Sequence, residues 1–137
     1  MKNVLTLMKK TSAAFGLVAI LATPVSAETV GVSMAAFDDN FLTVLRNGMV
    51  KMADSMSGVD MQVEDAQNDV AKQLDQINNF IASGVDAIIV NPVDTSATQA
   101  MTNAAKNAGV PLVYVNREPI NVNSLPDGQA FVSSNEI

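Results

Sequence analysis

The stretch DAIIVN, residues 86–91, is a short and continuous apolar run that ends in an amide before Pro92. Strands with helices packed on both faces have this pattern, because neither face offers a position in contact with water. The stretch therefore predicts an interior strand of a parallel α/β sheet. A stripe of apolar residues at helical spacing precedes it and ends at Gly84, which favours a helix followed by a strand.

Strand and helix patterns alternate outward from this stretch over the rest of the chain. Four further segments have the composition of strands: 28–36, 59–66, 111–116 and 129–134. Apolar residues at helical spacing lie between them in three stripes: Leu42, Leu45, Met49, Met52 and Met56; Val70, Leu74, Ile77 and Ile81; Ala97, Met101, Ala104 and Ala108. The alternation predicts a doubly wound parallel sheet with strand order 2-1-3-4-5 and helices on both faces. The methionine-rich first stripe is expected to fill the core.

Residues 1–27 have the features of a signal peptide rather than of the folded domain. Three lysines precede the apolar stretch 13–23, which is too short to span a bilayer, and small residues follow up to Ala27. We expect cleavage after Ala27, export to the periplasm, and a folded domain over 28–137. An amphipathic anchor or a first core helix is the alternative interpretation of the same residues.

The charge and the missing residue types narrow the function. Without residues 1–27 the chain keeps five of its eight basic residues and all fourteen acidic ones, a net charge of −9. That charge repels nucleic acid and anionic lipid, so neither is an expected partner. The sequence has no Cys and no His, which excludes a thiol nucleophile, a histidine-based triad and an ordinary zinc site. We expect no metal and no cofactor.

Polar and aromatic residues follow the carboxyl ends of the predicted strands, where ligands bind in doubly wound sheets. The candidate ligand-binding residues are Asp39, Asn40 and Phe41 after the first strand and Asn116 and Arg117 after the fourth, with Phe37, Asp38, Asn68 and Asn91 as weaker candidates. None of these segments is rich in Gly, so no phosphate-binding loop is predicted. Carboxylates, amides, a guanidinium and aromatic rings suit a polyhydroxylated ring, whose hydroxyls both donate and accept hydrogen bonds.

The acidic and amide candidates also have structural interpretations, which the sequence leaves open. Asp38 or Asp39 could cap the helix that follows the first strand, because both lie just before its apolar stripe. Asn68 or Asp69 could cap the next helix in the same way.

The remaining candidates have structural alternatives as well. Phe41 could be a core residue of the first helix. Asn91, which stands before Pro92, is typical of a turn. Arg117 could pair with Glu118 on the surface.

Residues 28–137 resemble the periplasmic sugar-binding proteins of ABC importers, of the ribose, galactose and inositol type. Four segments carry the resemblance: FDDNF (37–41), DAQNDVAKQLDQINNFIASGVDAIIVNPVD (65–94), AGVPLVYVNREP (108–119) and FVSSNE (131–136). The second of these segments is the most specific. The resemblance implies the type I periplasmic binding protein fold, which has two lobes, with 28–137 as an incomplete N-terminal lobe and the second lobe absent.

The resemblance also implies roles for the candidate residues. Asp39 and Asn40 would bond ligand hydroxyls, Phe41 would stack on the ring, and Asn116 with Arg117 would grip adjacent hydroxyls. The implied function is the capture of a monosaccharide or cyclic polyol, such as ribose, galactose or inositol, for import. Two lobes would close on the ligand about a hinge, and the closed form would dock on a membrane permease.

Three other functions are weighed against this one. A sugar-processing enzyme would use Asp38, Asp39 or Asp94, and it would need paired carboxylates, one with a raised pKa. A transcription regulator of this fold would need a helix-turn-helix before the first strand, where the signal peptide is predicted. Docking on a sugar-responsive chemoreceptor is compatible with transport, and the sequence does not separate the two.

Overall fold

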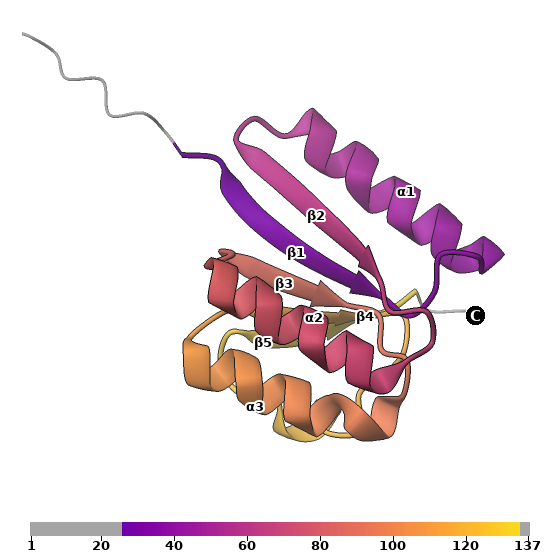
Figure 1. Ribbon diagram of the computed structural model, residues 1–137, viewed down its shortest axis with the longest axis vertical. Helices are drawn as coiled ribbons and strands as arrows, with labels where there is room; N and C mark the ends of the chain where they lie inside the picture. Colours follow the sequence, from indigo (N-terminus) through magenta and orange to yellow (C-terminus); the bar gives the residue numbers. More distant parts are fainter. Residues whose placement is uncertain (1–25, 135–137) are drawn as a thin grey trace, which may run out of the picture.

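The computed structural model describes residues 26–134. The predicted signal peptide up to residue 25 and the expected crossing at Asn135 and Glu136 lie outside the described residues. The elements are β1 (Glu28–Met34), α1 (Asn40–Ser55), β2 (Val59–Asp65), α2 (Val70–Ser83), β3 (Ala87–Val90), α3 (Thr98–Ala108), β4 (Leu112–Val115) and β5 (Gln129–Val132), with 3-10 turns η1 (Thr95–Ala97) and η2 (Val122–Ser124) (Figure 1). No helix within 26–134 combines the length and apolarity needed to cross a bilayer.

The five strands form one parallel sheet in the order β2-β1-β3-β4-β5, which confirms the predicted fold class and strand order. All strands point the same way, so their carboxyl ends and the loops after them meet along one edge (Figure 1). This carboxyl edge carries the loops 35–39, 66–69, 91–94 and 116–119. The last strand ends at Val132, which is shorter than the expected 129–134.

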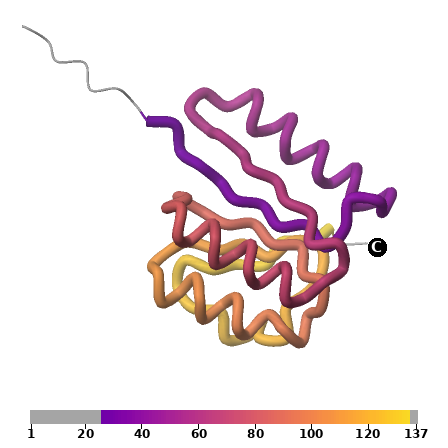
Figure 2. The backbone as a smooth tube through the Cα atoms, viewed as in Figure 1, coloured from indigo at the N-terminus to yellow at the C-terminus, as the bar shows by residue number. Residues whose placement is uncertain are grey.

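Helices cover both faces of the sheet, as the sequence predicts. α2 and α3 lie side by side on one face, and α1 lies on the other over β1 and β2 (Figures 1 and 2). The α2–α3 face holds the larger core, which includes Ile77, Phe80, Ile88, Met101, Leu112 and Tyr114. Gly31 of β1 permits this packing, because a Cβ atom there would come within 2.5 Å of the Phe80 ring.

The predicted inward stripe of α3 is correct at Met101, and Ala104 is half-buried, but the rest of the prediction is wrong. The helix buries Thr98, Met101, Thr102 and Ala105, whereas the predicted Ala97 lies in η1 and Ala108 is exposed. Hydrogen bonds explain the difference, because they make threonine acceptable in a core. The Tyr114 hydroxyl donates to the Thr98 carbonyl over 2.8 Å and lies 2.9 Å from the Thr102 hydroxyl. Burial raises the pKa of Tyr114 to about 12, so the phenol stays neutral at ordinary pH.

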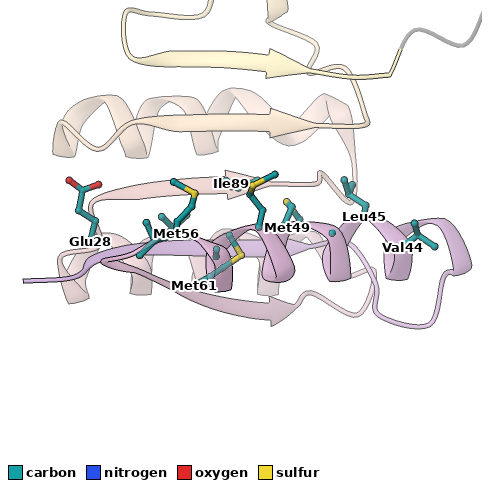
Figure 3. A pocket seen from close by; sticks show the side chains of 12 residues that line it. Glu28, Val44, Leu45, Met49, Met56, Met61 and Ile89 are labelled. Atoms are coloured by element: carbon teal, nitrogen blue, oxygen red, sulfur yellow. The ribbon is translucent and has the colours of Figure 1, made fainter.

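The methionine-rich stripe of α1 fills the core over only half its length. Leu42 is buried, but Met52 is 63% exposed and Met56, just beyond the helix, is 51% exposed. The expectation that the whole stripe is core is therefore wrong, because the C-terminal part of α1 does not close onto the sheet. The exposed side chains line an apolar groove of about 550 Å³ between α1 and the sheet, seen from close by in Figure 3.

Candidate functional site

The loop between β1 and α1 brings the acidic candidates to the carboxyl edge. Asp39 is the N-cap of α1, and its Oδ1 accepts a 2.8 Å hydrogen bond from the Leu42 amide. Asp38, the other possible cap, is exposed and does not cap the helix. Asn40 opens the helix and is exposed, as is Asp39. Capping therefore occupies one oxygen of Asp39 and leaves the loop facing water.

Phe41 is a surface residue. Its side chain is 50% exposed, so the alternative interpretation as a core residue is wrong. The ring lines a hollow of about 220 Å³ at the carboxyl edge. Asn116 lines the same hollow, together with Leu45, Val115, Val132, Ser133 and Ser134. The structure thus brings together two candidates that lie 75 positions apart in the sequence.

Asn116 ends β4 in an unusual backbone conformation. Its φ of 67° lies in the left-handed region, which costs most L-residues about 1–2 kcal/mol but which Asn adopts more readily. The backbone amide of Asn116 donates to the Val132 carbonyl over 3.0 Å. The backbone amide of Arg117 donates to the Val115 carbonyl over 2.8 Å. The chain therefore leaves the strand in a tight turn at the position of the polar pair.

Arg117 contacts the loop that follows β3. Its Nη1 donates to the carbonyl of Pro92 over 2.8 Å and to that of Val93 over 3.2 Å. Surface pairing with Glu118, the alternative interpretation, is not found among the described residues. The guanidinium is half-buried and is held across the carboxyl edge by one of its nitrogens.

Phe37 and Asn68 have packing or backbone roles at this edge. The Arg46 guanidinium lies 4.1 Å from the centre of the Phe37 ring, and Phe37 packs against the core beneath α1. Asn68 is exposed with a φ of 57°, and its amide donates to the Ala35 carbonyl over 2.7 Å. The N-cap of α2 is Asp69, one of the two residues that the sequence left open for this role.

Asn91 lies beneath the edge rather than on it. It is fully buried, and its Oδ1 accepts from the Ala35 amide over 3.4 Å. Its Nδ2 donates to the Val115 carbonyl over 3.2 Å. Asn91 therefore links β1 and β4 across β3, and in this structure its side chain is out of reach of a ligand.

Two buried glutamines of this region were not predicted from the sequence. Gln73 and Gln76 of α2 are 0% and 4% exposed and bond to the ends of several strands. Their signal was available, because both fall on the same helical face as Ile77 and Phe80. Amides at such positions are stable only when they are hydrogen-bonded, which points to a buried network.

Asp94, one of the carboxylates that an enzyme would use, has a pKa shift of the wrong sign for a general acid. The pKa of Asp94 is lowered by hydrogen bonds from the Ser96 hydroxyl and amide. A general acid at neutral pH needs the opposite shift. Within 26–134 no cluster of three or more acidic side chains could hold a metal ion.

Comparison with known proteins identifies the family. Residues 30–136 match the family described as periplasmic binding protein domain. The chain belongs to this family. A candidate rhizopine-binding protein of Rhizobium meliloti is 59% identical over 130 residues, which are 95% of this chain and 42% of that protein. The ribose import binding protein of Bacillus subtilis is 36% identical over 65% of this chain and 29% of its own length.

Solved structures agree with the fold. An ABC transporter solute-binding protein of Bacillus halodurans with bound myo-inositol superposes with a TM-score of 0.69 at 37% identity, covering 72% of this chain and 34% of its own. The arabinose-binding component from Shewanella sp. ANA-3 gives 0.67 at 31% identity, covering 78% and 35%. The chain thus spans well under half the length of these relatives, all of which are binding proteins.

Proposed function

We propose that this chain forms the ligand-binding lobe of an exported solute receptor for an ABC importer and binds a monosaccharide or cyclic polyol at the carboxyl edge. The observation that carries the proposal is the hollow shared by Phe41 and Asn116. A ring against which a sugar can stack stands there beside an amide that both donates and accepts. Arg117, Asp39 and Asn40 follow strand ends at the same edge. Export would follow cleavage after Ala27.

A neutral cyclic polyol is the ligand class that we favour. Amide and guanidinium groups discriminate hydroxyl positions, because an unpaired partner in a closed cleft costs about 1–3 kcal/mol. The relative with bound myo-inositol, a neutral cyclitol, supports this ligand class over a charged solute. Binding, rather than turnover, fits the lowered pKa of Asp94.

The proposed mechanism is closure of two lobes about a hinge. The carboxyl edge would be one wall of the cleft, and a second lobe would supply the other. This chain spans 42% of the Rhizobium meliloti relative, which leaves length for a second lobe in that protein. The closed form would then dock on a permease.

A chimera tests the function, with this chain replacing the matched segment of the Rhizobium meliloti relative. Calorimetry and thermal unfolding would be measured with myo-inositol, D-galactose and D-ribose, and with D-glucuronate as a charged control. We expect saturable binding of at least one neutral ligand, which at 100 times Kd stabilises the protein by about 2.7 kcal/mol. No binding of any neutral ligand, or its turnover, would contradict the proposal.

Phe41 provides a first check on the site in this chimera. Phe41→Ala should weaken binding about four- to tenfold, because about half of a ring's 1.5–3 kcal/mol burial energy is lost. Phe41→Trp should bind nearly as well as the parent. The free energy of unfolding without ligand should hardly change in either variant, since the Phe41 side chain is 50% exposed. The control is Met52→Ala, an exposed apolar residue of α1 outside the hollow, which should leave affinity unchanged.

A further inference from the structure

Gln73 is a fully buried amide that uses both of its functional groups. Its Nε2 donates to the Ser33 hydroxyl over 3.1 Å and to the Asn91 carbonyl over 3.0 Å. Its Oε1 accepts from the Val93 amide over 2.8 Å. A buried amide is stable only with such partners. Gln73 therefore ties α2 to β1 and holds the loop after β3 on both sides of Pro92.

The same loop supplies the acceptors of Arg117. The Arg117 guanidinium donates to the carbonyls of Pro92 and Val93. The Val93 amide, which bonds Gln73, lies between these two carbonyls in the chain. Pro92 has no backbone N–H, so it cannot anchor itself by donating a hydrogen bond. The bonds of Gln73 to Asn91 and Val93 flank this weak point. The position of both acceptors therefore depends on Gln73.

The backbone from which Arg117 departs is held by the same network. The side chain of Asn91, whose carbonyl Gln73 bonds, donates to the carbonyl of Val115 over 3.2 Å. Val115 is the last residue of β4, two positions before Arg117. Buried amides thus fix the start of the Arg117 segment and the loop that its guanidinium contacts.

We propose that Gln73 is a positioning residue, which pre-organises Arg117 for the ligand by fixing residues 91–93. The inference rests on the proposed function of the carboxyl edge and extends it to a residue that never touches the ligand. A long side chain loses rotamer freedom when a ligand orders it, so holding it beforehand strengthens binding. Without Gln73 the loop is free to shift, and Arg117 enters the complex from a broader ensemble.

Gln76 provides a matched control on the same helix. It is also a buried amide with two bonds: its Oε1 accepts from the Ser33 hydroxyl over 2.7 Å, and its Nε2 donates to the Asp65 carbonyl over 2.9 Å. Ser33 is shared with Gln73, but Gln76 makes no bond to residues 91–93. Loss of Gln76 therefore removes buried bonds while the bonds of Gln73 to Asn91 and Val93 stay in place.

A double-mutant cycle in the chimera, with myo-inositol as the probe, separates positioning from stability. Gln73→Met should weaken binding about tenfold when Arg117 is present and less than about twofold in an Arg117→Met background. Gln76→Met should lower the unfolding temperature similarly but change affinity less than about twofold in both backgrounds. Equal losses from Gln73→Met in both backgrounds would overturn the proposal.

A second measurement needs no ligand and is made on the chain itself. The Nε–Hε signal of Arg117 in ¹⁵N NMR spectra should be dispersed in the parent and move toward the position of a free arginine in Gln73→Met. Gln76→Met should leave it in place. If the chimera binds no polyol while this signal responds, the proposed function fails and the positioning role stands. An unmoved signal in folded Gln73→Met overturns the positioning role alone.

Gln73→Asn takes the place of Gln73→Met if the latter does not fold. The shorter amide cannot keep all three bonds, to Ser33, Asn91 and Val93, and it places no charge in the buried network. The same coupling with Arg117 is expected in the cycle, with a smaller loss of affinity. Purely additive losses in this variant would again overturn the proposal.

Discussion

Residues 28–137 on their own are expected to bind myo-inositol at least about 100-fold more weakly than the chimera, a difference of roughly 3 kcal/mol. Phe41, Asn40 and Asp39 are exposed in this structure, and the hollow beside them is open. Polar contacts in such a setting compete with water and lose the low dielectric that makes them strong and selective. Calorimetry on the two proteins measures the difference.

The isolated segment is also expected to associate at concentrations where the chimera stays monomeric. Val44, Met52 and Met56 are 71%, 63% and 51% exposed around the apolar groove. Exposed patches of this kind favour association. A Met52→Lys and Met56→Lys variant should reduce association in sedimentation experiments without restoring affinity. Tight, stoichiometric binding by monomeric 28–137 would show that one lobe suffices and would contradict the closure mechanism.

Much of the fold could be predicted because strand signals were local and unambiguous. Residues 87–90 within the run 86–91 are all apolar, Gly84 and Pro92 bound the run, and these four residues form the central strand β3. The strand order followed from the alternation of strands and helices, since right-handed crossovers leave few alternatives. These features depend on composition and spacing, which a sequence states directly.

Helix faces were harder because polar residues can be core residues when they are bonded. Gln73, Thr98 and Thr102 are buried, and their polar groups form hydrogen bonds with residues distant in the sequence. A pattern of apolar residues does not include such positions. The methionines of α1 show the reverse case, because their periodicity predicts burial although Met52 is exposed.

The position of Asp39, Phe41 and Asn116 at the carboxyl edge could be predicted, but the contacts of the candidate residues could not. Asp38 is the preferred cap from the sequence, but it is the Asp39 carboxylate that reaches the Leu42 amide. Arg117 bonds the backbone carbonyls of Pro92 and Val93. Every residue has a carbonyl, so this contact leaves no trace in the sequence.

Arg117→Met in the chimera is expected to weaken binding by about 1.5–3 kcal/mol, which is roughly ten- to 150-fold in Kd. The variant loses a charged donor to the ligand and also the bonds from Nη1 to Pro92 and Val93. The free energy of unfolding without ligand should therefore fall by about 1 kcal/mol. Arg117→Lys keeps the charge but not the planar fork of the guanidinium. Compared with Arg117→Met, it should restore more of the free energy of unfolding than of the binding affinity.

Asn116 needs a different substitution, because its backbone and its amide have separate roles. Asn116→Gly keeps the left-handed φ of 67° without strain and removes only the amide. Asn116→Ala removes the amide and adds about 1–2 kcal/mol of strain. Both variants should lose affinity by about 1 kcal/mol, while only Asn116→Ala should unfold more easily without ligand. Parental affinity in both Asn116→Gly and Arg117→Met, measured by calorimetry, would remove this pair from the binding site, because neither change would then touch a group that contacts the ligand.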